Sequence, residues 1–254
     1  NVRIQDFGEG DPVLLIHGAP NSGSTWAPLI PHLDGFRCFL VDRPGTGLSD
    51  DRVLRPDELC DVADRFVAEV LDGLELPRAH VVASSLGGFL ALRSAAATPD
   101  RVDRMVQMAC PAFAPGMRTP DFLRAIQIRP LRWLISRLPP SRKANNDIMR
   151  QIGHGASLDA GRIPDSFFEW YADLHRYTNT MRNDFDMTAA GLNPKSFDPT
   201  TGLPPSVLGA VAAKTLFLWG EDDGFGGRDV AETTIARMPS ATLKMLPDFG
   251  HLPW

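Results

Sequence analysis

Ser85 stands at the centre of the run Val-Ala-Ser-Ser-Leu-Gly-Gly, residues 82–88. A strand-like apolar segment precedes this serine and a helix-like segment follows it, which predicts a very tight turn that needs small residues two positions to either side. Ala83 and Gly87 meet that need. The turn would expose the Ser85 hydroxyl and direct the N-terminus of the next helix at it, as a nucleophile requires. An ordinary serine-rich turn before a helix is the alternative interpretation.

An acid and a base follow later in the chain. Asp222 and Asp223 come after the apolar run 215–219, and His251 comes after the run 241–246. A serine hydroxyl is a poor nucleophile at neutral pH, so it needs a base, and the imidazole in turn needs a carboxylate to fix its tautomer. Open α/β sheets place their sites at the carboxyl ends of the strands. The order serine, acid, histidine at three such ends therefore predicts a catalytic triad.

A second loop can complete the site. His17-Gly18-Ala19-Pro20 directly follows the first strand-like run. The backbone amides of Ala19 and Leu86 are candidates to bind an oxyanion, and each donor of this kind contributes roughly 3 kcal/mol to the transition state. His17 is an alternative base, but we expect it to pack and to shape the loop.

Six short apolar runs alternate with longer amphipathic stretches. Continuous apolar strands separated by helices predict a mostly parallel sheet with helices on both faces. The expected strands are residues 12–17, 38–41, 79–83, 102–109, 215–219 and 241–246, and residues 2–7 are a candidate for one more. The expected helices in the same part of the chain are residues 24–33, 56–73, 86–97 and 228–238.

Residues 111–210 differ from the rest of the chain. They hold 11 of the 22 prolines and lack strand-like runs, while helical stretches remain at 122–138, interrupted at Pro130, and at 166–178. We therefore predict a helical lid, 111–210, inserted into a core made of residues 1–110 and 211–254. Trp26, Trp170 and Tyr171 are candidates to line a substrate pocket beneath it. His154 and His175 have no partners at metal-binding spacing and are expected at the surface or in the pocket wall.

The composition excludes several classes of function. The chain has 254 residues, is 43% apolar and carries a net charge of −5. It has no basic excess for nucleic acid and no apolar run of the roughly 20 residues that a membrane helix needs. Three scattered cysteines, Cys38, Cys60 and Cys110, indicate buried thiols in a reducing compartment. We expect a cytoplasmic protein whose partner is a small molecule, with neither nucleic acid nor membrane as a partner.

With these motifs in this order, the chain resembles the α/β-hydrolase fold family, in its lid-bearing form. The resemblance implies Ser85 as nucleophile, His251 as base, Asp223 as acid with Asp222 as runner-up, and no metal or organic cofactor. It also implies an oxyanion hole made by the amides of Ala19 and Leu86. The segments that carry the resemblance are 17–20, 42–49, the turn at Ser85, 220–223 and 250–251.

The chain departs from the family pattern in three places. Ala83 replaces the usual first glycine of the turn, and Ser84 stands where a histidine is frequent; neither removes a catalytic atom. The family also usually begins with an extra hairpin and continues in a helix after the histidine, whereas this sequence runs from Asn1 to Trp254. We therefore expect the sequence to be incomplete at its ends.

Three functions fit this pattern. The first is a serine hydrolase, carboxylesterase- or lactonase-like, that cleaves an ester, lactone or thioester of a small to medium, apolar substrate through an acyl-enzyme. The second is a carbon–carbon bond hydrolase that uses the same triad on a diketone-like substrate. The third is a non-catalytic receptor for a small molecule on the same fold. Dehalogenases and epoxide hydrolases of this fold use an aspartate at the turn, so Ser85 argues against both.

Overall fold

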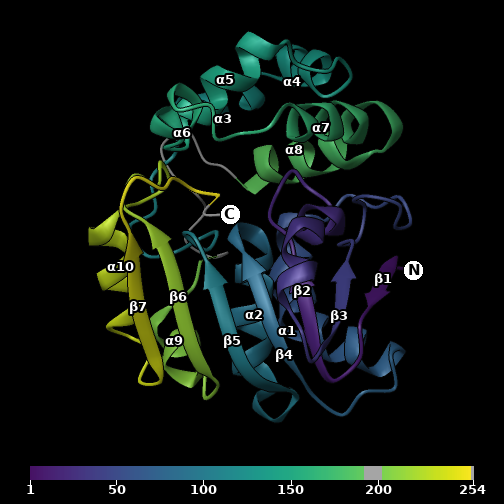
Figure 1. Cartoon of the computed structure of the whole chain (residues 1–254), viewed down its shortest axis with the longest axis vertical. Helices are drawn as coiled ribbons and strands as arrows, with labels where there is room; N and C mark the ends of the chain where they lie inside the picture. Colours follow the sequence, from purple (N-terminus) through teal and green to yellow (C-terminus); the bar gives the residue numbers. More distant parts are fainter. Residues whose placement is uncertain (192–201, 253–254) are drawn as a thin grey trace.

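A seven-stranded sheet forms the centre of the molecule in the computed structural model, which describes residues 1–191 and 202–252 (Figure 1). The strand order is β1-β3-β2-β4-β5-β6-β7, and every neighbouring pair is parallel except β1 and β3. The fold is therefore the predicted α/β-hydrolase fold. The strands are β1 Ile4–Phe7, β2 Asp11–Ile16, β3 Phe36–Val41, β4 Ala79–Ser84, β5 Val102–Met108, β6 Lys214–Gly220 and β7 Ala241–Leu246.

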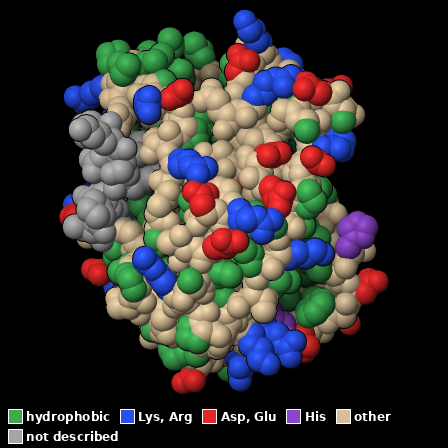
Figure 2. All heavy atoms as spheres, turned by 90° about the vertical axis from the view of Figure 1, so that its left-hand side faces the viewer, with side chains coloured by type: hydrophobic (Ala, Val, Ile, Leu, Met, Phe, Trp, Pro, Cys, Tyr) green, Lys and Arg blue, Asp and Glu red, His purple; other side chains and the backbone are tan. Residues whose placement is uncertain are grey.

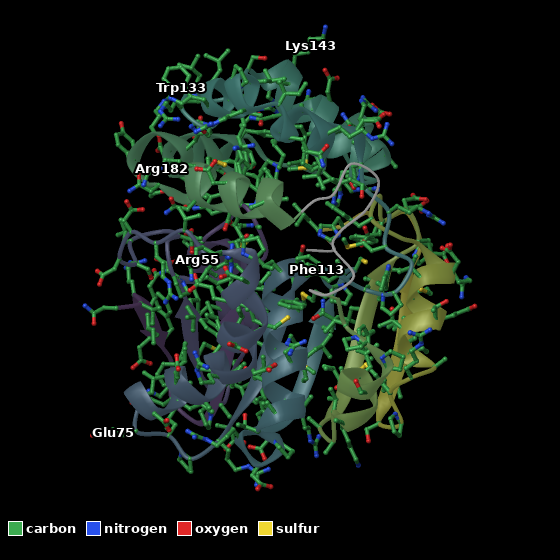
Figure 3. The ribbon with its side chains drawn as sticks, turned by 180° about the vertical axis from the view of Figure 1, so that it is seen from behind. Arg55, Glu75, Phe113, Trp133, Lys143 and Arg182 are labelled. Atoms are coloured by element: carbon green, nitrogen blue, oxygen red, sulfur yellow. The ribbon has the colours of Figure 1, made fainter. Side chains whose placement is uncertain are left out.

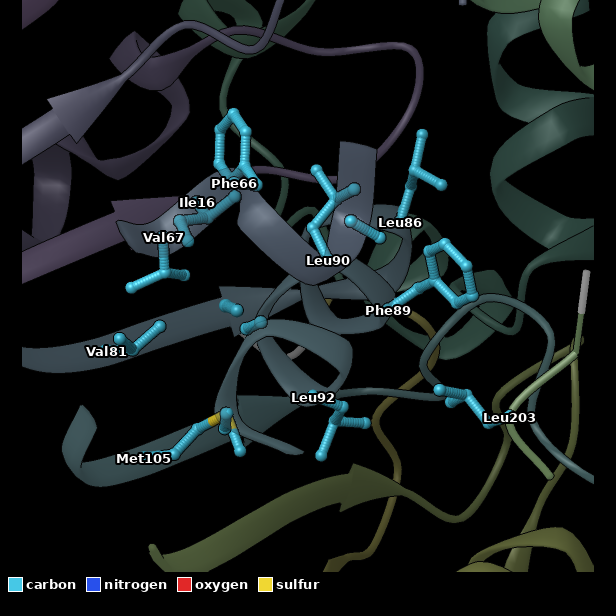
Figure 4. Close-up of a cluster of buried hydrophobic side chains, with 14 of the residues drawn as sticks. Ile16, Phe66, Val67, Val81, Leu86, Phe89, Leu90, Leu92, Met105 and Leu203 are labelled. Carbon is cyan, nitrogen blue, oxygen red and sulfur yellow. The ribbon is translucent and has the colours of Figure 1, made fainter. Parts of the chain in front are cut away.

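Alternate residues of the central strands are buried on opposite faces of the sheet. On β2, Leu14 and Ile16 join the large core beneath α1 (Pro56–Gly73) and α2 (Ser85–Ala97), which Figure 4 shows. Val13 and Leu15 of the same strand join a smaller core with Trp26, which lies in η1 (Gly23–His32). This alternation follows from the two-residue period of a strand. It confirms that both faces of the sheet are covered, as the continuous apolar runs predict.

The predicted elements agree closely with those observed. Helix α1 spans the predicted residues, and it begins with Pro56 followed by Asp57 and Glu58, where the helix dipole favours acidic groups. The segment predicted as a helix at 24–33 is instead a 3₁₀ helix, η1. Pro28 and Pro31 lie inside it, and in an α-helix the ring of an interior proline clashes with the carbonyl group four residues earlier, which disfavours the predicted α-helix.

Six helices, α3 to α8, follow β5 and form what we call the helical insertion. Figure 1 shows these helices as a layer above the carboxyl ends of the strands. The predicted helix at 122–138 is two helices, since the first ends at Gln127 and Pro130 lies in the first turn of the second. The insertion comprises α3 Asp121–Gln127, α4 Arg129–Ile135, α5 Arg142–Gln151, α6 Gly155–Asp159, α7 Asp165–Tyr177 and α8 Thr180–Gly191.

Two further helices follow the insertion and pack against elements of the core, and the first of them falls inside the range 111–210 predicted for the lid. Helix α9 (Pro205–Ala210) packs against α2, and α10 (Arg228–Ile235) packs against β7. On the face shown in Figure 2, acidic and basic side chains are interspersed, so that face presents no continuous basic stripe. Among residues 1–191 and 202–252, no helix is both long and apolar enough to span a bilayer.

Candidate active site

The turn at Ser85 joins β4 directly to α2. The φ angle of Ser85 is 50°, a left-handed conformation that a serine adopts at a cost, and such strain is common at functional residues. Gly87 lies so close to the carbonyl oxygens of Ile16 and His17 that a methyl group there would overlap both. The Ser85 carbonyl accepts a hydrogen bond of 3.0 Å from the amide of Ala112, which follows β5. The residues around Ser85 therefore hold the turn in a single conformation.

Asp223 and His251 meet at the ends of β6 and β7. The Nδ1 atom of His251 lies 3.0 and 2.9 Å from the two carboxylate oxygens of Asp223, and both side chains are buried. The carboxylate also accepts hydrogen bonds of 2.9 Å from the amides of Cys110 and Phe225. Asp222, the alternative acid in the sequence, is exposed. The geometry therefore pairs the histidine with Asp223.

Ser85 and His251 line the same cavity beneath the helical insertion. About 740 Å³ of empty space lies within the cavity and its mouth, a volume that includes open solvent. Figure 3 shows Phe113, another lining residue, at the carboxyl ends of the strands below the insertion. The Phe225 ring packs on the His251 ring with centroids 4.4 Å apart. The lining is mainly apolar, and its remaining members are Ala19, Pro20, Pro56, Leu59, Leu86, Cys110, Ala112, Met117, Phe122, Leu123, Asp184, Phe185, Met187, Thr188 and Gly191.

The loop after β2 is held by a buried network. Ala19 of this loop and Leu86 both line the cavity. Arg43, which is fully buried, donates hydrogen bonds to the carbonyl oxygens of His17 and Gly18 and forms a bidentate ion pair with Asp184 of α8. The network therefore ties the candidate oxyanion loop to the helical insertion. Burial raises the pKa of Asp184, and the Arg43 guanidinium opposes that rise.

Two other reactive groups near the site are held in their neutral forms. Burial is the main reason why the pKa of His17 lies well below its usual value, and the positive charge of Arg43 lowers it further. Both ring nitrogens of His17 are engaged, Nδ1 with the Gly18 carbonyl and Nε2 with the Arg43 amide, so this histidine packs as expected. Burial and the nearby Asp223 raise the pKa of the Cys110 thiol well above its usual value. A thiol that stays protonated is a poor nucleophile, so Cys110 is a weaker candidate for a nucleophile than Ser85.

The three aromatic residues expected to line the pocket are not among the lining residues. Trp26 packs in the smaller core on the other face of the sheet. The Trp170 indole donates a hydrogen bond of 2.9 Å to the Ser24 hydroxyl, and the Tyr171 ring stacks on Phe167. The aromatic wall is formed instead by Phe113, Phe122, Phe185 and Phe225. Helical periodicity alone does not distinguish the face of α7 or η1 that would reach a cavity.

The two histidines of the helical insertion also differ from expectation, since both are buried. Nε2 of His175 lies 2.9 Å from the Ile135 carbonyl. His154 accepts a hydrogen bond from the Leu252 amide, next to His251. The sequence gives no local signal for this contact, because residues 154 and 252 are brought together only by the folded insertion. Similarly, nothing in the sequence pairs Arg43 with Asp184. Within the described ranges, no group of three His, Cys, Asp or Glu side chains is arranged to bind a metal ion.

The parallel sheet, the strained serine at a strand–helix turn and the buried Asp–His pair together define an α/β-fold hydrolase. The chain belongs to the alpha/beta hydrolase fold family, whose model matches residues 11–253. This assignment confirms the resemblance that the sequence motifs indicate.

Three curated relatives illustrate the similarity. A protein from Cupriavidus pinatubonensis, named 2-hydroxy-6-oxononadienedioate/2-hydroxy-6-oxononatrienedioate hydrolase, is 28% identical over 98% of this chain and 84% of its own length. A protein of the same name from Burkholderia vietnamiensis is 30% identical with the same coverage. A 2-hydroxy-6-oxo-6-phenylhexa-2,4-dienoate hydrolase from Burkholderia cepacia is 26% identical, again over 98% and 84%. All three are hydrolases, so the predicted class of enzyme is supported.

Solved structures share the fold. A meta-cleavage product hydrolase aligns with a TM-score of 0.75 and 22% identity, covering 98% of this chain and 87% of the other. A 2-hydroxy-6-oxo-6-phenylhexa-2,4-dienoate hydrolase from Rhodococcus sp. aligns with a TM-score of 0.78 and 20% identity, covering 98% and 88%. At these identities the comparison establishes the architecture of the chain.

Proposed function

We propose that the protein hydrolyses a carbon–carbon bond beside a ketone, with Ser85 as nucleophile, His251 as base and Asp223 as the acid that orients it. The observation that carries the proposal is the apolar cavity that Ser85 and His251 both line, in a chain whose curated relatives are named as hydrolases of 2-hydroxy-6-oxo acids. Such acids contain no ester, lactone or thioester, so hydrolysis has to break a bond between carbons. This activity is the second of the three functions that fit the sequence, and the relatives favour it over ester hydrolysis.

The first half of the proposed reaction is acyl transfer to Ser85. Its hydroxyl oxygen attacks the ketone carbon while the proton passes to Nε2 of His251, and Asp223 stabilises the resulting imidazolium through Nδ1. The amides of Ala19 and Leu86 bind the oxyanion. Collapse of the tetrahedral intermediate breaks the carbon–carbon bond. In a 2-hydroxy-6-oxo dienoate this step requires the 2-oxo tautomer, which forms when the 2-hydroxyl group loses its proton and C5 gains one. The electron pair left on C5 then delocalises into the C2 carbonyl, and the departing carbon takes the proton from His251.

The second half is hydrolysis of the acyl-enzyme. His251 removes a proton from water, the hydroxide attacks the acyl carbon, and the proton returns to the Ser85 oxygen as the carboxylic acid leaves. The balance is one ketone and one water consumed, and one carboxylic acid and one protonated carbon fragment formed. Ester hydrolysis would use the same groups and differ only in the leaving atom. The stabilisation of the leaving carbon is therefore what separates the two activities.

A direct comparison of substrates tests this proposal. We expect the protein to consume 2-hydroxy-6-oxo-6-phenylhexa-2,4-dienoate and release benzoate, with a kcat/KM at least about 100-fold above that for 4-nitrophenyl benzoate, which carries the same acyl group. Loss of the dienoate absorbance and appearance of benzoate would be measured. Rapid ester cleavage with an intact dienoate would reinstate the ester hypothesis. Retention of either compound without turnover would favour the receptor hypothesis.

The helical insertion is expected to act as a lid that sets specificity. Phe185 of α8 lines the cavity and lies next to Asp184. Replacing Phe185 with alanine would remove a ring from the wall and enlarge the cavity. We therefore expect the preference for a phenyl ketone over the matching methyl ketone, measured as the ratio of their kcat/KM values, to change by about 10-fold or more. Trp133→Ala is the matched control, because Trp133 is an aromatic residue of the same insertion that is 59% exposed. Unchanged ratios in Phe185→Ala would contradict a specificity role for this wall.

A further inference from the structure

The turn between α5 and α6, residues 151–154, lies directly against the two loops that carry the candidate acid and base. We call it the α5–α6 turn. The amide of His251 donates a hydrogen bond of 2.9 Å to the Ile152 carbonyl. The amide of Leu252 donates one of the same length to Nε2 of His154. Consecutive amides at the catalytic histidine are thus bound by one short segment of the helical insertion.

The same turn packs without space against the neighbouring backbone. Gly153 has a φ of 92°, and a methyl group on it would overlap the Asp222 carbonyl oxygen and approach the Cα of Gly250 to 2.9 Å. A methyl group on Gly224 would overlap the Gln151 carbonyl oxygen. The turn therefore contacts the chain on both sides of Asp223 as well as the His251 loop.

His154 contributes the only side chain to the hydrogen bonds just described. The side chain is 4% exposed, and its own backbone amide bonds to the Met149 carbonyl, which closes the end of α5. Nε2 has to be unprotonated to accept the Leu252 amide. Burial, and then the nearby His251, lower the pKa of His154 to about 4, while Asp223 opposes the shift, so the ring is neutral at pH 7. Because Nε2 is occupied, His154 is not positioned to take a proton from substrate.

We propose that His154 is a positioning residue, which fixes the backbone after His251 and so keeps the catalytic imidazole against Asp223. Through it, the placement of the helical insertion over the cavity is coupled to the placement of the base. The inference uses the roles proposed above for Ser85, His251 and Asp223 but does not depend on which bond the enzyme breaks. Histidines that bind metal ions give the scale of such effects. Removing the side chain that orients such a histidine commonly lowers metal affinity or activity about 10- to 100-fold.

Two substitutions at position 154 separate positioning from packing. His154→Leu keeps an apolar side chain of moderate size but removes the acceptor, whereas His154→Gln places an amide oxygen near the position of Nε2. His175→Leu is the matched control, because His175 is also buried in the insertion but bonds to Ile135, away from the triad loops. The rate of covalent labelling by an organophosphonate is the main readout, since it reports on nucleophile and base whatever the natural substrate is.

We expect His154→Leu to slow labelling and to lower kcat by about 10- to 100-fold with KM changed less than about threefold. His154→Gln should recover to within about threefold of the parent, and His175→Leu should label at the parent rate. In NMR spectra, the resonance of the proton on Nδ1 of His251, which is hydrogen-bonded to Asp223, should broaden or shift in His154→Leu and in neither of the other two variants. If His154→Leu is labelled at the same rate as the parent protein, the proposal is overturned. The proposal is also overturned if His175→Leu loses as much of the labelling rate as His154→Leu does. If the parent protein is labelled at a normal rate but does not hydrolyse dienoates, the proposed function is contradicted and the role of His154 is not.

Discussion

Ser85→Ala is expected to abolish both turnover and covalent labelling. The strained turn exposes this hydroxyl in the cavity that His251 also lines. Without its oxygen no acyl-enzyme can form, and only binding and the oxyanion donors remain to accelerate the reaction. By comparison with other enzymes that use a serine–histidine–acid triad, the loss in kcat should be roughly 10⁵-fold or more. Steady-state kinetics and intact-mass analysis after organophosphonate treatment measure the two effects.

Ser84→Ala is the matched control, because Ser84 is the adjacent residue and is buried at the end of β4. The parent and Ser84→Ala should each gain one equivalent of phosphonate, and peptide mapping should place the adduct on Ser85. An adduct on Ser84, or a Ser85→Ala enzyme that still turns over at the parent rate, would refute the assignment of the nucleophile. Thermal unfolding of both variants checks that lost activity does not reflect lost structure.

The features of the site that depend on local sequence were predictable. The turn at Ser85 needs small residues at 83 and 87, and each of these lies only two positions from Ser85 in the chain. The apolar runs of β2 and β3 mark their own strands, because the last four residues of each are buried and a strand covered on both faces has to be apolar there. The order of serine, acid and histidine at strand ends then follows from topology. Fold and family are therefore predictable from the local sequence.

The features that depend on tertiary contacts were not predictable. Arg43 and Asp184 are 141 residues apart, and either one alone is an ordinary charged residue. His154 meets Leu252 only because the α5–α6 turn lies against the loop that follows β7, a placement that no periodicity encodes. The aromatic lining was missed for the same reason, since Trp170 and Phe122 are both aromatic residues in helices and only packing determines which of them faces the cavity. The choice between ester and carbon–carbon hydrolysis depends on the leaving group of the substrate, and the residues of the triad are the same for both.

Asp223→Asn is expected to lower kcat by roughly 10⁴-fold while the fold persists. The Asp223 carboxylate accepts hydrogen bonds from three donors, which are Nδ1 of His251 and the backbone amides of Cys110 and Phe225. An asparagine has one oxygen and one NH₂ group, so its NH₂ has to face one of these donors. If it faces His251, the ring must present the unprotonated Nδ1 and carry its proton on Nε2, where it can no longer accept the serine proton.

The neighbouring aspartate provides the test of specificity. Asp222 precedes Asp223 in the same loop but is exposed, so Asp222→Asn removes an equal charge without touching the imidazole. It should keep kcat within about twofold, because exposed charges contribute little. A crippled Asp222→Asn beside a mild Asp223→Asn would reverse the assignment of the acid. If both variants showed an equal, small loss of kcat, His251 would work without a carboxylate partner. We do not expect this result, because Asp223 is buried against Nδ1 of His251 and a buried charge is retained where it is paired.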